Sequence, residues 1–239
     1  MILLYIVYIF GYLAGGLLGY KPYFRLDKLT KRNVLNSILL VLVVFTALLV
    51  AYNTGFFPQF VAAPFMVFSY LLLAGFFSGY AFRLMKIKSR SGALLYSYRS
   101  FWTDHAPALL SIVIILFGLY RTGFFTNDPV TAIRLSSGLS LICFGFLGWT
   151  FKAVPDFRSG GIILLDQIIE WKHVIAWHWH SENVIKIEYL SGTDQIVRNV
   201  KEFLTSIPED ERVDIETILR SKMEEFEEER NQLLTGDQS

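Results

Sequence analysis

The run VLNSILLVLVVFTALLVAYNTGFFPQFVAAPFMVFSYLLLAGFFSGYAF, residues 34–82, contains no Asp, Glu, Lys, Arg or His. A hydrocarbon core about 30 Å thick needs roughly 20 apolar residues of helix, so this run can cross a membrane twice, with a break at YNTGFFPQ. Shorter runs without such residues cover 1–20, 106–120 and 135–151 of the 239-residue chain, which is 53% hydrophobic. We therefore predict an all-α membrane part with five transmembrane helices, at about 1–20, 34–54, 59–82, 106–122 and 133–152.

Basic residues predict which loops face the cytoplasm. Loops 21–33 and 83–105 each carry five Lys or Arg and one Asp. Loop 53–58 has no charge, and loop 121–134 has two arginines and one Asp. Because short cytoplasmic loops are rich in Lys and Arg, we expect the N-terminus outside and the C-terminal domain in the cytoplasm. No Lys or Arg precedes the first run, so it lacks the basic start of a signal peptide and is expected to remain as a span.

Two sequence phrases occur twice at equivalent places in this topology. YNTGFF at 52–57 returns as YRTGFF at 120–125, each time at the outer end of an even-numbered span. LAGxxxGY at 13–20 returns at 73–80, each time at the cytoplasmic end of an odd-numbered span. A period of 60 to 69 residues at equivalent places is typical of duplication, so we interpret the membrane part as two and a half copies of one hairpin, repeated in parallel.

The repeated residues favour close helix packing. Glycines four apart clear one helix face so that another backbone can approach, and aromatic rings at helix ends lie at the level of lipid headgroups. The alternative is a groove for a lipid or pigment lined by these aromatics. Cys143, the only cysteine, lies in the fifth span and is expected to pack there. The expected packing positions are Gly15, Gly19, Gly75, Gly79, Gly145 and Gly148, and the expected interface anchors are Tyr20, Tyr80 and Trp149.

After residue 153 the pattern changes from helix to strand. Residues 154–161 are expected to form a linker, and 162–226 a small α+β domain in which a C-terminal helix caps one antiparallel sheet. The helix is expected to begin near Ser206–Glu209, and the acidic tail 227–239 to be partly disordered. The expected strands are 162–165, 168–171, 174–180, 184–190 and 195–200, with a turn at 191–194.

The domain resembles one that follows several transmembrane spans in uncharacterised bacterial proteins. The resemblance is carried by Gly161-Ile162, by Ile169-x-Trp171-x-x-Val174-x-x-Trp177, by the alternating strand and by the C-terminal helix. It departs from that pattern at Val174, where Ile is usual. The resemblance implies a bacterial inner-membrane protein with a small cytoplasmic β domain of pleckstrin-homology-like shape, and it implies no activity.

The run WKHVIAWHWHSE, residues 171–182, is the one candidate for chemistry. In a strand, His178 and His180 share one face while Trp177 and Trp179 share the other. With His173 or Glu182 as a further ligand, the two imidazoles form a weak candidate for a metal site. The alternative is a tryptophan face against the sheet core or bilayer surface with the imidazoles exposed. Contacts with lipid or a partner are then expected at Trp171, Trp177 and Trp179.

The sequence favours a non-enzymatic role. It contains no phosphate-binding loop, no dinucleotide fingerprint and no nucleophile elbow, so we predict neither catalytic residues nor a cofactor. Residues 209–230 hold ten acidic and four basic residues, which argues against nucleic-acid binding. The leading hypothesis is a scaffold or accessory subunit that works with the bilayer and with another membrane protein or a second copy. The alternatives are a small transporter or channel for an apolar or neutral solute, and a metal-dependent membrane enzyme.

Overall fold

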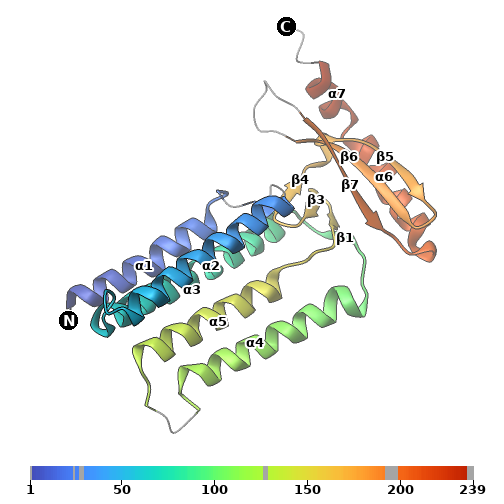
Figure 1. Cartoon of the computed structure of the whole chain (residues 1–239). Helices are drawn as coiled ribbons and strands as arrows, with labels where there is room; N and C mark the ends of the chain where they lie inside the picture. Colours follow the sequence, from blue (N-terminus) through green and yellow to red (C-terminus); the bar gives the residue numbers. More distant parts are fainter. Residues whose placement is uncertain (1, 24, 27–29, 126–128, 192–198, 236–239) are drawn as a thin grey trace. The chain divides into compact units, whose positions relative to one another are not determined.

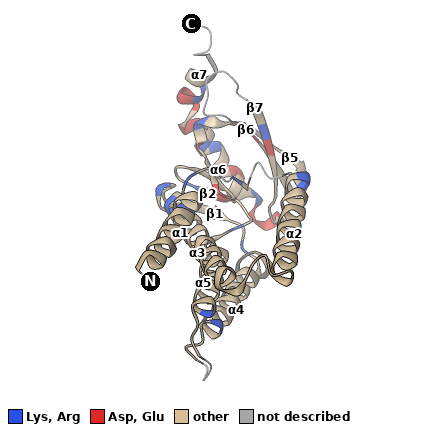
Figure 2. Cartoon of the chain, turned by 60° about the vertical axis from the view of Figure 1, so that its left-hand side comes forward, with Lys and Arg blue, Asp and Glu red and all other residues tan. Residues whose placement is uncertain are grey.

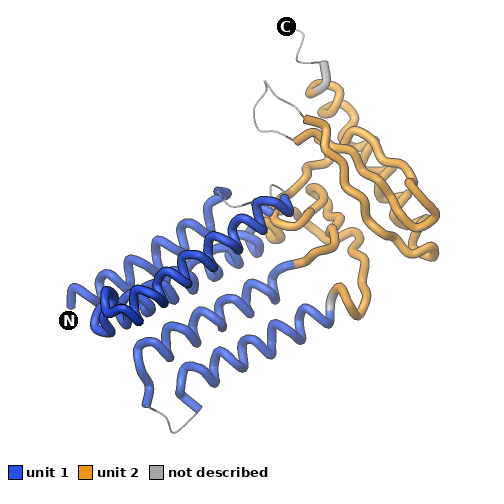
Figure 3. The backbone as a smooth tube through the Cα atoms, in the orientation of Figure 1, with its two compact units in different colours: residues 1–86, 104–151 blue, residues 87–103, 152–239 orange. Residues whose placement is uncertain are grey.

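The chain of this computed structural model forms two compact units (Figure 3). The helical unit contains residues 1–86 and 104–151, and the sheet unit contains residues 87–103 and 152–239. Because the sheet unit takes a segment from the middle of the sequence, the chain passes between the two units three times. The residues whose structure is described are 2–23, 25–26, 30–125, 129–191 and 199–235.

Long apolar helices make up the helical unit (Figure 1). Five helical segments are long and apolar enough to cross a membrane, the fourth running from Phe101 to Thr122. The prediction of five such helices is confirmed at this level, although α3 continues past its expected end at residue 82. Charged residues gather at helix ends and in the sheet unit, while the helix bodies are uncharged (Figure 2). The helices are α1 (Ile2–Tyr20), α2 (Lys31–Asn53), α3 (Gln59–Arg90), α4 (Ala106–Thr122) and α5 (Ala132–Thr150).

Glycines bring α1 and α3 into backbone contact. A Cβ atom added at Gly15 would lie 2.1 Å from the carbonyl oxygen of Leu72, and one added at Gly19 would lie 2.1 Å from that of Phe76. On α3, a Cβ at Gly75 or Gly79 would lie 2.0 or 2.1 Å from a carbonyl oxygen of α1. These distances exclude any side chain, so the two G-x-x-x-G patterns face each other and set the approach of the helices.

A second close contact joins α4 and α5. A Cβ at Gly138 would lie 2.7 Å from the carbonyl oxygen of Gly118, which places the two backbones side by side. Nearer the other end of the pair, Cβ atoms at Gly145 and Gly148 would lie 2.9 and 2.7 Å from the backbone and side-chain oxygens of Ser111. Small residues therefore run along the whole seam of this helical hairpin.

The repeated Thr-Gly-Phe-Phe phrase ends a helix in both of its copies. Gly55 and Gly123 adopt positive φ angles of 80° and 87°, which glycine tolerates better than other residues. The Gly55 amide donates to the Tyr52 carbonyl at 3.1 Å, and the Gly123 amide donates to the Tyr120 carbonyl at 3.2 Å. The two copies therefore form the same kind of helix end, one after α2 and one after α4.

The sheet unit contains two antiparallel sheets rather than the single sheet expected from the sequence. The first has the strand order β1-β2-β3-β4, and the second has the order β5-β6-β7. A hydrophobic core joins both sheets and α6, with Phe157, Ile187 and Leu219 fully buried. The strands are β1 (Leu94–Ser97), β2 (Asp156–Arg158), β3 (Gly161–Leu164), β4 (Gln167–Ile169), β5 (Val174–Ser181), β6 (Val184–Ser191) and β7 (Asn199–Ser206).

The structure differs from the sequence prediction at several places in this unit. Residues 154–161, expected to be a linker, contain β2 and the first residue of β3. The strand expected over 168–171 ends at Ile169, because Trp171–His173 forms a 3₁₀ turn. The expected turn at 191–194 lies mostly outside the described residues, as does the expected strand 195–200.

The C-terminal helix begins later than predicted and is interrupted. A 3₁₀ turn at Glu209–Glu211 precedes α6 (Arg212–Glu225), and α6 ends at Phe226. A second helix, α7 (Glu227–Thr235), occupies most of the tail that was expected to be partly disordered. Ile215 and Leu219 are fully buried, so α6 covers the core, as expected of the C-terminal helix.

Candidate functional site

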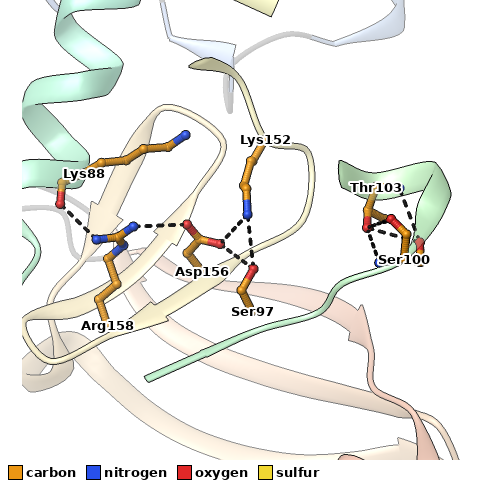
Figure 4. A network of polar contacts seen from close by, with 7 residues as sticks. All are labelled: Lys88, Ser97, Ser100, Thr103, Lys152, Asp156 and Arg158. Atoms are coloured by element: carbon orange, nitrogen blue, oxygen red, sulfur yellow. Dashed lines mark hydrogen bonds and ion pairs between the residues drawn. The ribbon is translucent and has the colours of Figure 1, made fainter. Parts of the chain in front are cut away.

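A buried carboxylate lies where β1 pairs with β2 (Figure 4). Asp156 is 3% exposed, and its Oδ1 accepts a 2.7 Å hydrogen bond from the hydroxyl of Ser97. The Nζ of Lys152 lies 3.6 Å from Oδ1, and the Nη2 of Arg158 lies 3.5 Å from Oδ2. A hydroxyl and two cations therefore hold one carboxylate, which offsets the cost of burying its charge.

Arg158 extends this cluster into neighbouring segments. Its Nη1 donates to the carbonyl oxygens of Lys88, in the last turn of α3, and of Gly92, at 3.2 and 3.1 Å (Figure 4). Its own carbonyl oxygen accepts a 2.8 Å hydrogen bond from the indole nitrogen of Trp171. We call Ser97, Lys152, Asp156 and Arg158 the joint, because they tie the end of α3, β1, β2 and the start of the C-terminal segment together.

The segment that enters α4 begins with a reciprocal pair of hydrogen bonds between Ser100 and Thr103. The Ser100 amide donates to the Thr103 hydroxyl oxygen at 2.9 Å, and the Thr103 amide donates to the Ser100 hydroxyl oxygen at 3.3 Å. This reciprocal pair is a capping box for the π-helix Phe101–His105, which runs directly into α4.

The three predicted contact tryptophans have different surroundings. Trp171 is 1% exposed and belongs to the core, which is one of the two places that the sequence allowed for the tryptophan face. Trp177 and Trp179 are partly buried against the same core. The indole nitrogen of Trp179 donates a 2.7 Å hydrogen bond to Glu216 on α6, and the guanidinium of Arg212 lies 4.3 Å from the centre of its ring. The tryptophan face of β5 is therefore largely engaged with the core and α6.

The candidate metal ligands do not form a site with further ligands. His178 and His180 are exposed on β5, and His173 lies in the 3₁₀ turn before that strand. Within the described part of the chain, no three His, Cys, Asp or Glu side chains are grouped so that they could hold a metal ion. The cross-strand neighbour of His178 is Lys186, which pairs with Glu202 at 2.5 Å. Lys186 therefore places a cation beside His178 on this face of the sheet.

The predicted interface anchors also differ in exposure. Tyr20 and Trp149 are 38% and 54% exposed, which leaves their rings at the surface of the helical unit. Tyr80 is 3% exposed, and its ring stacks on Phe76 with a centroid distance of 6.1 Å. Tyr80 is therefore a packing residue, because a buried ring cannot reach the headgroup layer.

A groove runs beside β1 and was not foreseen from the sequence. It has a volume of about 370 Å³ and lies between the strand and the start of α6. The Tyr96 hydroxyl donates a 2.6 Å hydrogen bond to Glu211 across it. Burial and this hydrogen bond to a carboxylate raise the pKa of Tyr96. The residues that line the groove are Leu94, Leu95, Tyr96, Ser97, Arg99, Glu211 and Asp214.

Comparison of the chain with models of known protein families, with curated proteins and with solved structures gives no match. The class of protein is therefore defined by the fold: helices apolar enough to cross a membrane, joined to a small unit of two antiparallel sheets. Within that unit, the joint and the groove beside β1 both combine charge with a defined geometry.

Proposed function

We propose that this chain is a non-enzymatic integral membrane protein, a scaffold or accessory subunit whose sheet unit docks a partner at the membrane surface. One observation carries the proposal: β1 pairs with β2, although α4 and α5 lie between these strands in the sequence. The chain passes between this unit and the helices at three points. Such a connection suits a module that docks a ligand close to the membrane.

The pairing of β1 with β2 also supports the proposed topology. The chain that leaves after β1 must return on the same side of the membrane before β2, so it crosses an even number of times. The helical hairpin of α4 and α5 provides two crossings. Together with the basic loops 21–33 and 83–105, this favours an N-terminus outside and a cytoplasmic sheet unit in a bacterial inner membrane.

The resemblance to the uncharacterised bacterial family agrees with this arrangement. Sheets of four and three antiparallel strands, followed by a helix, are the elements expected of a pleckstrin-homology-like domain. We propose that β1 is the first strand of this domain and that the α4–α5 hairpin is inserted between its first and second strands. All the strands of the proposed domain then belong to the sheet unit.

The helical unit has an exposed surface that a partner within the membrane can cover. None of the residues of α2 is buried, so lipid or the helices of another membrane protein or of a second copy must cover this helix. The proposed partners are accordingly the bilayer, a membrane protein or second copy at the helices, and a docked ligand at the sheet unit.

Native mass spectrometry of the full chain, extracted from its own membranes in a mild detergent, tests the docking role. We expect the main species to carry a bound protein or a stoichiometric lipid that detergent exchange does not remove. An unrelated membrane protein of similar size, purified in parallel, gives the background of adventitious lipid. A bare monomer as the main species would contradict the proposal.

A further inference from the structure

The outer strand of the first sheet has one edge that pairs with no other strand. β1 is at the end of the strand order β1-β2-β3-β4, and within the described residues only β2 pairs with it. Leu94 and Leu95 on this strand are 40% and 39% exposed. An exposed edge of this kind presents main-chain donors and acceptors on which an additional extended strand can form.

The groove beside this edge defines where an additional strand would lie and which charge its side chains should carry. Two carboxylates, Glu211 and Asp214, line it together with one guanidinium, Arg99. Glu209 and Asp210 precede Glu211 in the same 3₁₀ turn, so acidic side chains outnumber basic ones at this end of α6. Burial is the main cause of the raised pKa of Tyr96, and the nearby carboxylates of Glu211 and Asp210 raise it further.

We propose that an extended segment of a partner protein, carrying Lys or Arg, adds to the free edge of β1 and lies in this groove. Its main chain pairs with β1, its apolar side chains pack on Leu94 and Leu95, and its cationic side chains meet Glu211 and Asp214. The proposal rests on the docking role above and narrows the ligand to a protein. Anionic lipid headgroups and nucleic acids are disfavoured because the same carboxylates repel them.

The test uses the full chain in detergent and a fluorescent peptide of four Lys-Val repeats, with four Glu-Val repeats as the charge-reversed control. Fluorescence anisotropy is expected to show binding of the Lys-Val peptide and at least tenfold weaker binding of the Glu-Val peptide. The same Lys-Val peptide with methylated backbone nitrogens keeps its charge but cannot donate to β1, so its binding is expected to be lost.

Two double variants, each of which removes two negative charges, distinguish binding in the groove from general attraction to the acidic start of α6. Glu211→Gln with Asp214→Asn removes the two carboxylates of the groove while leaving an oxygen that can accept from Tyr96, and is expected to weaken binding about tenfold. Glu209→Gln with Asp210→Asn changes the neighbouring carboxylates, which do not line the groove, and is expected to leave binding within about twofold.

Three results would overturn strand addition at this groove. They are the absence of Lys-Val binding, binding that survives backbone methylation, and equal weakening by the two double variants. None of them changes the outcome of the mass-spectrometry test, in which any bound protein or lipid supports docking. The failure of this inference and the failure of the proposed function are therefore distinguishable.

Discussion

The hydroxyl of Ser97 lies 2.7 Å from the carboxylate of Asp156, although 59 positions of sequence separate the two residues. Ser97 ends β1 and Asp156 begins β2, and their Cα atoms are partners in the antiparallel register. The whole α4–α5 hairpin lies between them in the chain. The contact therefore joins the two strands between which the hairpin is inserted in the sequence.

Removal of the buried carboxylate is expected to open the joint. Asp156→Ala removes the carboxylate that faces Lys152 and Arg158 and should lower the free energy of unfolding of the sheet unit by about 3 kcal/mol. Ser97→Ala removes the hydrogen bond that the hydroxyl donates to Asp156 and the longer one that it accepts from Lys152, and should lower the free energy of unfolding by about 1 kcal/mol. Hydrogen exchange of β2 and β3 amides measures both changes.

The matched control for this prediction is Ser181→Ala, at an exposed position on β5. We expect it to change the free energy of unfolding by less than about 0.5 kcal/mol. Equal protection of β2 and β3 in the wild type and in Asp156→Ala would show that the joint does not stabilise the unit.

Adjacent glycines on α1 should respond in opposite ways to the same substitution. A Cβ at Gly15 would lie 2.1 Å from the Leu72 carbonyl oxygen, whereas the nearest atom to a Cβ at Gly16 is 3.7 Å away. Gly15→Ala should therefore destabilise the α1–α3 contact by about 2 kcal/mol, and Gly16→Ala should be neutral or slightly stabilising. The thermal midpoint of the protein in detergent measures both, and similar midpoints for the two variants would contradict the close packing.

The sequence predicted the helices well because the bilayer imposes a simple rule on composition. Runs such as 34–82 lack charge whatever they pack against, so their helices follow from length alone. The strand Val184–Ser191 was also foreseen, because Ile185, Ile187 and Tyr189 alternate with polar residues. These features are local, and local patterns are what a sequence displays directly.

The groove and the joint depend on contacts between distant segments, and the sequence does not display those. β1 has four residues, and β2, with which it pairs, follows two further helices in the sequence. The strand pattern extends over Trp171, whereas this residue lies in a 3₁₀ turn and belongs to the core. Tyr80 was assigned by its place at a helix end, but close packing buries it.

The contact between Trp179 and Glu216 should make stability depend on pH. The hydrogen bond from Trp179, and then that from Arg212, lowers the pKa of the Glu216 carboxyl. Because this pKa is lower in the folded state, the stabilisation is complete above the ordinary glutamate pKa of about 4.3 and is lost as the pH falls through the folded value.

Urea unfolding of the wild type and of Glu216→Gln, followed by tryptophan fluorescence, measures this dependence. The wild type should be the more stable of the two at pH 7, and the difference between their midpoints should shrink as the pH falls below about 4. Glu228→Gln, at an exposed position on α7, makes the same charge change and should follow the wild type. A difference that stays constant with pH would contradict the assignment.

β1 precedes the α4–α5 hairpin in the sequence, yet it pairs with a strand that follows that hairpin. The formation of an engineered disulfide between the segments before and after the hairpin tests this pairing most directly. Ala93 and Ser159 bond to each other twice: the Ser159 amide lies 2.9 Å from the Ala93 carbonyl oxygen, and the Ala93 amide lies 3.0 Å from the Ser159 hydroxyl oxygen. The variant carries Cys at both positions and Cys143→Ser, which removes the native thiol. The control carries Cys at Ala93 and at Ser181 instead.

The protein is oxidised mildly in native membranes and then cleaved by a protease between the two positions. We expect the fragments of the variant with Cys at Ala93 and Ser159 to remain linked until they are reduced, and the control fragments to separate. Fragments that separate in both variants, or that are linked equally in both, would contradict the insertion of the hairpin into the sheet unit.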